Sequence, residues 1–219
     1  MEIREIQTNK KQVVHAVTDI HLATFRGFFL TFMGRGFLRQ MYSAYCAHEA
    51  SGLLVAFEDE VPVGFLAYSE DMSGLYKYMI KSRLIPFAWY SAGAFFRKPA
   101  VFMRLVRAFL KPAEAEREEK YVELASIGVS PNAKKMGVGT ALINTLKSKV
   151  DFDKFEYITL DTDEVNNDAA NLFYIKNGFK EARRFQTHEG RKMIEYRFHG
   201  KERSSKNENL EAALYTQHN

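Results

Sequence analysis

Residues 127–143 read IGVSPNAKKMGVGTALI, and this stretch decides how the fold is interpreted. An apolar, strand-forming run over 122–129 leads into a short basic loop that contains Lys134 and Lys135. Gly137 then opens a segment with helical spacing. A strand, a basic loop with glycine and a helix start are how proteins hold a phosphate chain. Free backbone N–H groups and the positive end of the helix dipole converge there, and glycine permits close approach.

Of three known patterns for phosphate-binding loops, only one is matched by this stretch. A Walker loop requires G-x-x-x-x-G-K-[ST], but Ala133 replaces the second glycine and Lys135 the hydroxyl residue. A Rossmann fingerprint requires G-x-G-x-x-G, and Leu142 stands where a small residue must let helix and strand pack closely. A third pattern, V-x-P-x-x-(basic or Gln)-x-x-G-x-G before an amphipathic helix, is matched in order by Val129, Pro131, Lys134, Gly137 and Gly139.

A second pattern lies downstream, over residues 167–179, which read NDAANLFYIKNGF. It matches N-x-x-A-x-x-[LF]-Y-x-x-x-G-F at every fixed position. Together, the two patterns resemble the acyl-coenzyme A loop and the downstream signature of the GNAT N-acetyltransferase superfamily. The resemblance covers residues 119–198 firmly and 1–70 loosely, and it leaves 71–118 unexplained. Lys134 stands where the family usually has Gln or Arg. Its ammonium group can still donate hydrogen bonds, but it lacks the planar arrangement of donors that a guanidinium offers.

The resemblance implies an α/β (α+β) fold in which a mixed, mostly antiparallel sheet carries helices on both faces. Strands are expected over 2–6, 53–57, 63–68, 121–129, 156–161, 185–188 and 193–198. Helices are expected over 11–25, 37–47, 137–150 and 168–177, with a glycine-interrupted apolar link over 27–36 and a glycine cap at Gly178. Residues 1–198 are expected to form one domain with a helical insert at about 71–118, followed by a polar tail over 199–219.

The resemblance also implies where acetyl-CoA binds. The expected contacts are Ile127, Gly128, Val129, Lys134, Lys135, Met136, Gly137, Val138, Gly139, Thr140, Asn167, Ala170 and Phe173. In this family an amine attacks the thioester directly, so no covalent nucleophile is needed. Tyr174 matches the tyrosine near the thioester sulfur, where a phenol can hydrogen-bond the departing thiolate. Asn167 matches a pantetheine contact, and a plain helix cap is the alternative for it.

The general base is predicted from the residues themselves. Glu123 lies six residues before Val129 in the same strand, so the two-residue period predicts that both face the same side of the sheet. A carboxylate there can take a proton directly or through a water molecule, and a surface Glu paired with a Lys is the alternative. Asp161, at the end of the next strand, and His21, in the first helix, are reserve candidates.

The insert differs from the rest of the chain in composition. Between residues 74 and 113 it holds eight basic residues, nine aromatic residues and no acidic ones, whereas the remainder carries a net charge of −4. Four interpretations arise: a cover over the acceptor pocket, a dimer interface, a surface for anionic membrane, and a site for single-stranded nucleic acid. The pocket cover is favoured and nucleic acid is the least supported. A pocket cover predicts that Trp89 is shielded from solvent in the monomer.

Composition indicates whether the chain can form a core and whether disulfides, metal sites or membrane segments are expected. A chain of 219 residues that is 46% hydrophobic can bury a substantial core. The single cysteine, Cys46, can form no internal disulfide and is expected to be buried, and no Cys/His cluster has zinc spacing, so no metal is expected. The N-terminus lacks a signal-like apolar run, and the nearly uncharged stretch 84–96 is too short to span a bilayer, so a cytoplasmic location is expected.

The expected function is acyl-CoA-dependent N-acyltransfer, with acetyl passing from acetyl-CoA to a primary amine of a small-molecule or sugar acceptor. A monomer or homodimer is expected, without nucleic acid, and membrane contact through the insert is not favoured. The alternatives are a non-catalytic acyl-CoA-binding module and an enzyme for longer acyl chains or lipid-linked acceptors. Acceptor pockets are built from loops without fixed motifs, so the sequence does not identify the acceptor.

Overall fold

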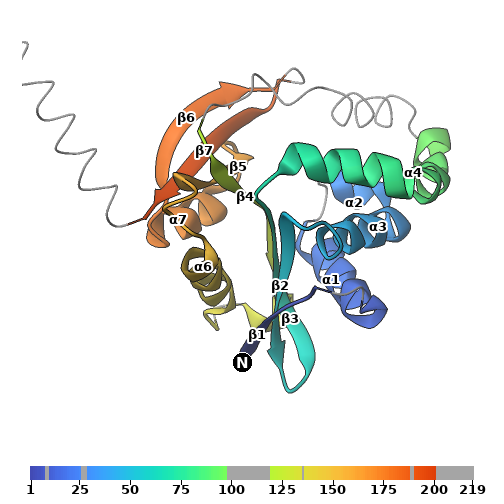
Figure 1. Cartoon of the computed structure of the whole chain (residues 1–219), viewed down its shortest axis with the longest axis horizontal. Helices are drawn as coiled ribbons and strands as arrows, with labels where there is room; N and C mark the ends of the chain where they lie inside the picture. The colour runs from blue at the N-terminus through green and yellow to red at the C-terminus, as the bar shows by residue number, and fades with distance from the viewer. Residues whose placement is uncertain (8–9, 26–28, 98–118, 135, 188–189, 201–219) are drawn as a thin grey trace, which may run out of the picture. The chain divides into compact units, whose positions relative to one another are not determined.

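A computed structural model describes residues 1–7, 10–25, 29–97, 119–134, 136–187 and 190–200 (Figure 1). At positions 29, 84, 88 and 91–97 it describes the backbone alone. The chain falls into two compact units. The N-terminal unit is Met1–Arg117 with Glu123–Lys147, and the C-terminal unit is Glu118–Val122 with Ser148–Asn219.

The sheet of the N-terminal unit is antiparallel, with the strand order β1-β2-β3-β4. The strands are β1 (Glu2–Glu5), β2 (Ser51–Glu58), β3 (Val61–Ser69) and β4 (Tyr121–Val129), of which β4 belongs to this unit from Glu123 onward. Asp59 and Glu60 join β2 to β3 with φ values of 47° and 64°. Two positive φ values in a two-residue loop are typical of a type I′ hairpin. The strands expected over 53–57 and 63–68 are therefore confirmed, and they form a hairpin with a two-residue turn.

Helices cover both faces of this sheet (Figure 1). One face carries α1 (Lys11–Thr24), α2 (Phe29–Met33), α3 (Arg35–Tyr45) and α4 (Met72–Arg97), and the other carries α6 (Val138–Lys149). Phe65 of β3 meets the ring of Tyr42 from α3, with centroids 5.1 Å apart. The neighbouring Gly64 points the opposite way, and a Cβ on it would lie 2.7 Å from Val138 of α6. Glycine thus lets α6 approach the strand closely.

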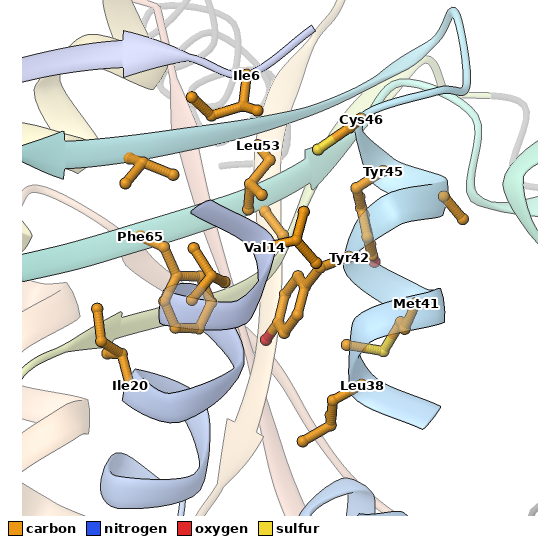
Figure 2. Packing of buried hydrophobic residues seen from close by; sticks show 14 of the residues in the cluster. Ile6, Val14, Ile20, Leu38, Met41, Tyr42, Tyr45, Cys46, Leu53 and Phe65 are labelled. Atoms are coloured by element: carbon orange, nitrogen blue, oxygen red, sulfur yellow. The ribbon is translucent and has the colours of Figure 1, made fainter. Parts of the chain in front are cut away.

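The core of the N-terminal unit lies between the sheet and the helices α1 and α3. Figure 2 shows Tyr42 reaching from α3 toward Phe65, with Val14 and Ile20 of α1 beside them. The helical spacing of apolar residues in α1 and α3 provides this packing, as the sequence predicts. Cys46 is buried at the end of α3, and burial raises the pKa of its thiol to about 12. It therefore stays protonated and acts as a small apolar group.

The first part of the insert is the long helix α4. Pro86 lies inside it, and Arg83, three residues earlier, departs from helical geometry with φ −134° and ψ 15°. Proline removes a helical hydrogen bond and clashes with the preceding turn, which accounts for a kink at this point. The helical character of the insert is confirmed over 72–97, and residues 98–118 lie outside the described part of the chain.

The C-terminal unit has an antiparallel sheet in the order β5-β7-β6 and one helix. Its elements are β5 (Tyr157–Asp163), α7 (Asp168–Lys176), β6 (Lys180–Gln186) and β7 (Lys192–His199). Gly178 ends α7 with φ 78°, the Gly178 N–H donates to the Ile175 carbonyl, and the Phe179 N–H donates to that of Tyr174. This is the Schellman arrangement, so the predicted glycine cap is confirmed.

Two predicted elements need correction. The link over 27–36 contains the five-residue helix α2, because its apolar residues pack against the core. The strand β6 begins at Lys180 instead of residue 185, since its first residues are charged and exposed and so lack the alternation that marks a strand. Its Arg183 pairs at 2.6 Å with Glu195 of β7, which is fully buried. Of the polar tail expected over 199–219, residues 201–219 lie outside the described part of the chain.

Within the described ranges, no helix is both long and apolar enough to cross a bilayer.

Candidate active site

The loop after β4 is hydrogen-bonded to the neighbouring strand β3. The Ser130 N–H donates to the Val63 carbonyl of β3 at 2.8 Å, and Pro131–Ala133 form one turn of 3-10 helix (η1). The Ala133 N–H closes this turn onto the Ser130 carbonyl at 2.9 Å, and the Ala133 side chain is buried. The backbone of the loop is therefore held in place before its basic residues begin.

The start of α6 has the features that an anion site requires. Gly137 takes the left-handed φ of 76°, and a Cβ built on it would meet nothing within 4 Å. The first helical hydrogen bond runs from the Ala141 N–H to the Gly137 carbonyl at 3.0 Å, so the preceding N–H groups have no acceptor within the helix. The first turn contains no acidic residue. Open space, free donors and the helix dipole meet at this point.

The predicted contact residues of this loop lie around that helix start. Val138 is buried against Gly64, whereas Gly139 is half-buried. The exposed ones are Lys134, Met136, Gly137 and Thr140. Lys135 lies outside the described residues.

A β-bulge in β4 overturns one prediction about the base. Ala67 of β3 pairs with Ser126 while Tyr68 pairs with Leu124, so Ala125 is an extra residue in β4. An extra residue reverses the alternation of faces. Glu123 therefore lies on the same face as Ser126, and Val129 lies on the opposite face. The prediction that Glu123 and Val129 share a face is wrong because the two-residue period holds only in an uninterrupted strand.

Glu123 thus lies on the face that carries α1 and α3. Its charge acts on Tyr45 of α3, whose pKa is raised first by burial, then by Tyr76 and then by Glu123. On the same face, the Ser126 hydroxyl lies 3.5 Å from that of Tyr42. Gly128 follows, and a Cβ there would lie 2.7 Å from the Phe65 ring. A carboxylate, a hydroxyl and an apolar wall therefore line this side of β4.

A buried hydrogen-bonded pair continues from Ser126 into the core. His21 Nδ1 lies 2.7 Å from the Tyr42 hydroxyl, and His21 is 2% exposed. Its other nitrogen, Nε2, is buried and has no hydrogen-bond partner among the described residues. Burial lowers the pKa of His21 to about 4. The imidazole is therefore neutral at pH 7, with Phe25 packed on it at 4.6 Å between ring centroids.

The lowered pKa of His21 predicts a pH dependence of stability. The unfolded chain binds a proton near pH 6.5 and the folded chain only near pH 4, so the free energy of unfolding falls as the pH drops through this window. His21→Asn cannot titrate but keeps a group at the Nδ1 position. We expect it to remove about 3 kcal/mol of the wild-type change in unfolding free energy between pH 7 and pH 4.

Urea unfolding at several pH values measures this effect. His15→Asn is the matched control, because His15 is an exposed residue of the same helix. An unchanged pH slope in His21→Asn would show that His21 binds its proton at the same pH in the folded and the unfolded chain, so that burial does not lower its pKa.

The C-terminal unit holds the second group of predicted residues, on and before α7. Asn167 stands at the N-cap position, but its side chain does not cap the helix. Its amide instead donates to the Thr162 hydroxyl at 2.6 Å and to the Asp163 carbonyl at 3.3 Å. Asn171 donates to the same carbonyl at 3.2 Å. The two asparagines thus tie α7 to the end of β5, so the plain side-chain cap considered for Asn167 is wrong.

Tyr174 is half-buried on α7 among aromatic rings. Its ring centroid lies 5.5 Å from Phe173, 6.1 Å from Phe179 and 6.1 Å from Tyr196. Burial raises the pKa of Tyr174 to about 12. The phenol therefore keeps its proton at neutral pH and is able to donate a hydrogen bond. Ala170, one turn earlier, is also half-buried, and the reserve candidate Asp161 is exposed on β5.

Three polar residues beside β4 were not predicted from the sequence. Tyr42 and Ser126 extend from His21 to the strand, and the Thr24 hydroxyl donates to the Val129 carbonyl at 3.2 Å. They come from α1, α3 and β4, and no local pattern marks residues so distant in sequence. Among the residues with described positions, no three His, Cys, Asp or Glu side chains gather as a metal site would need.

Comparison with known families agrees with this arrangement. A family model described as Acetyltransferase (GNAT) family matches residues 14–179, well over half of the chain. The chain belongs to the GNAT acetyltransferase family. It is accordingly an N-acetyltransferase, and members of its family use acetyl-CoA. The matched range includes both sequence patterns.

Solved structures show the same fold at low sequence identity. A GNAT-family protein from Desulfovibrio desulfuricans is 15% identical with a TM-score of 0.59, covering 90% of this chain and 99% of its own. The aminoglycoside 6′-acetyltransferase type Ii is 16% identical with a TM-score of 0.59, covering 91% and 97%. The ribosomal-protein-S18-alanine N-acetyltransferase from Escherichia coli is 13% identical with a TM-score of 0.53, covering 90% and 94%. No curated protein sequence matches the chain. The predicted α/β fold is therefore confirmed, whereas the acceptor is not identified by these structures.

Proposed function

We propose that this acetyltransferase transfers the acetyl group of acetyl-CoA directly to a primary amine of a small-molecule or sugar acceptor. The observation that carries the proposal is the start of α6, where Gly137 leaves open space before a helix turn without acidic residues. A pyrophosphate fits these donors and this charge. Lys134, exposed in the same loop, adds a cation beside it.

The other predicted contacts with acetyl-CoA lie in β4 and in the C-terminal unit. The backbone of Ile127, Gly128 and Val129 would pair with the pantetheine arm as an added strand. For Asn167, Ala170 and Phe173 of the C-terminal unit, the downstream sequence pattern alone supports a contact with acetyl-CoA. These assignments rest on the sequence patterns and on the family. The open helix start supports the pyrophosphate end of the site.

Two side chains have chemistry suited to the transfer. Glu123 would take the proton of the acceptor ammonium, directly or through a water molecule, so that the free amine attacks the thioester carbon. Backbone N–H groups of β4 would donate to the carbonyl oxygen as its charge grows. Tyr174 would donate a hydrogen bond to the departing sulfur, for which its raised pKa keeps it protonated. The aromatic neighbours of Tyr174 fix the ring direction and so support this role.

Release of free thiol from acetyl-CoA across a panel of primary amines tests the proposal. The panel should contain amino sugars, polyamines, amino acids and short peptides, each with its N-acetylated product identified by mass. We expect turnover with at least one small-molecule or sugar amine. A chain that binds acetyl-CoA with a micromolar Kd but acetylates only peptides would contradict the proposed acceptor class.

Glu123→Gln tests the assignment of the base. The amide keeps the shape of the side chain but cannot accept the ammonium proton, so kcat should fall by about 10²- to 10⁴-fold. The loss should be greatest at low pH, where an unassisted amine remains protonated, and should shrink as the pH approaches the pKa of the amine. Glu156→Gln is the matched control, because Glu156 is a half-buried carboxylate that the proposal does not use. Equal losses at all pH values would argue against proton removal by Glu123.

A further inference from the structure

The helix α4 has two faces of different character, and the described residues of its inner face pack against the N-terminal unit. Leu75 and Met79 are buried in the core of the N-terminal unit. Beyond the kink, Phe87 packs edge-on against Phe37 of α3, with centroids 4.9 Å apart. Tyr90 covers Gly36 of α3 so closely that no side chain fits there. This face therefore holds α4 to the rest of the unit.

The outer face of α4 is formed by four residues at four-residue spacing: Lys77, Lys81, Ile85 and Trp89. Each of them comes two positions after a residue of the inner side. Those inner residues are, in the same order, Leu75, Met79, Arg83 and Phe87. At 100° per residue, an offset of two places them on opposite sides of a helix. Exposure agrees: both lysines are exposed, Ile85 is 82% exposed and Trp89 is 78% exposed.

The exposure of Trp89 contradicts the favoured interpretation of the insert at this residue. A cover over an acceptor pocket predicts that Trp89 is shielded in the monomer, but it is among the most exposed large apolar side chains described. Fully burying one such side chain is worth about 1.5–3 kcal/mol. Two of them beside each other, at Ile85 and Trp89, indicate a surface that meets an apolar partner.

Charge indicates the nature of that partner. The helix Met72–Arg97 contains no acidic residue, and residues 98–113 add four basic residues and again no acidic one. A second copy of the chain that used the same face would bring two pairs of Lys77 and Lys81 together, and α4 itself has no carboxylate to neutralise them. An anionic bilayer supplies negative headgroups for the lysines and an apolar boundary for Ile85 and Trp89. Tryptophan favours this boundary because its ring is apolar and its N–H is polar.

We propose that the outer face of α4, made of Lys77, Lys81, Ile85 and Trp89, binds the surface of an anionic bilayer. The kink at Arg83 separates the two lysines from Ile85 and Trp89. Each half of the face thus has its own partner: anionic headgroups for the first and the acyl boundary for the second. The helix lies in the plane of the interface, as amphipathic basic helices do. This surface is separate from the loop and strand assigned to acetyl-CoA.

Trp89 is the only tryptophan of the chain, so its fluorescence reports on this face alone. The full-length protein is mixed with phosphatidylcholine vesicles containing 30% phosphatidylglycerol and with pure phosphatidylcholine vesicles. We expect a blue shift of about 10 nm and co-sedimentation with the anionic vesicles only. Raising the salt concentration to about 0.5 M should reverse both effects, because it screens the headgroup charge.

Variants separate the two halves of the face. Lys77→Gln with Lys81→Gln should weaken partitioning onto anionic vesicles about 30-fold, the equivalent of about 1 kcal/mol per lysine. Ile85→Ser should weaken partitioning about tenfold and reduce the blue shift of Trp89. Lys11→Gln with Lys192→Gln removes the same charge from two exposed residues elsewhere and should change partitioning less than threefold. Circular dichroism confirms that each variant is folded.

Two results would overturn the proposal. The first is wild-type protein that neither shifts its emission nor sediments with anionic vesicles at 0.1 M salt. The second is a blue shift that grows with protein concentration without vesicles, together with a dimer that Ile85→Ser dissociates. That second result would assign the face to another copy of the chain.

Discussion

Gly139→Glu is expected to abolish acetyl-CoA binding while the fold survives. Gly139 lies in the first turn of α6, next to the open space at Gly137. A carboxylate there occupies the proposed pyrophosphate position and repels its charge, and like charges in a binding site cost several kcal/mol. We therefore expect the Kd measured by calorimetry to rise by more than about 100-fold.

Asn144→Glu is the matched control for this charge change. Asn144 is an exposed residue of the same helix beyond its first turn, so the added charge is outside the proposed site. This variant should bind acetyl-CoA within about threefold of wild type. Both variants should retain a cooperative thermal transition. A Gly139→Glu protein that binds acetyl-CoA as wild type does would show that the loop is misassigned.

Tyr174→Phe is expected to lower kcat by about ten- to a thousand-fold with little change in acetyl-CoA affinity, the range for one charge-stabilising donor. The substitution keeps the ring, and with it the contacts to Phe173, Phe179 and Tyr196, and removes only the hydroxyl. The pKa of Tyr174 is raised to about 12, so its hydroxyl stays protonated between pH 7 and pH 9. The wild-type kcat should therefore not fall over this range through ionisation of Tyr174.

Tyr196→Phe is the control for the loss of a hydroxyl in the same aromatic cluster. Tyr196 is buried on β7 next to Tyr174, and no sequence pattern assigns it a role in catalysis. Its kcat should stay within about threefold of wild type. Equal kcat values for Tyr174→Phe and wild type would remove Tyr174 from the reaction. Equal losses in the two variants would indicate damage to the packing of α7 instead.

The sequence by itself determined the order of elements and the family. Proline at 131 and glycine at 137 and 178 mark the ends of helices and strands. In the segments between them, apolar residues recur every two residues or every three to four residues. The strand Tyr121–Val129 and the helix Val138–Lys149 lie where these periods predict. Backbone geometry at a turn or a helix end depends on a few adjacent residues, so a local pattern is sufficient to predict it.

Other features were not predicted because they depend on contacts between residues that are distant in the sequence. The first residues of β6 are charged and exposed, and they form a strand because β7 supplies their hydrogen-bond partners. The buried contacts of His21 with Tyr42 and of Tyr42 with Ser126 join three elements whose spacing in the chain has no period. Such contacts arise only when the tertiary fold brings distant residues together.

Tertiary structure also decided the face on which Glu123 lies. The sequence places Glu123 and Val129 an even number of residues apart, but the bulge at Ala125 reverses the alternation between them. A bulge depends on the register with β3, which no property of β4 alone determines. The sequence likewise revealed that the insert is basic and aromatic. Only the packing of α4 on α3 decided that Trp89 is exposed, because a helix buries whichever side its neighbour covers.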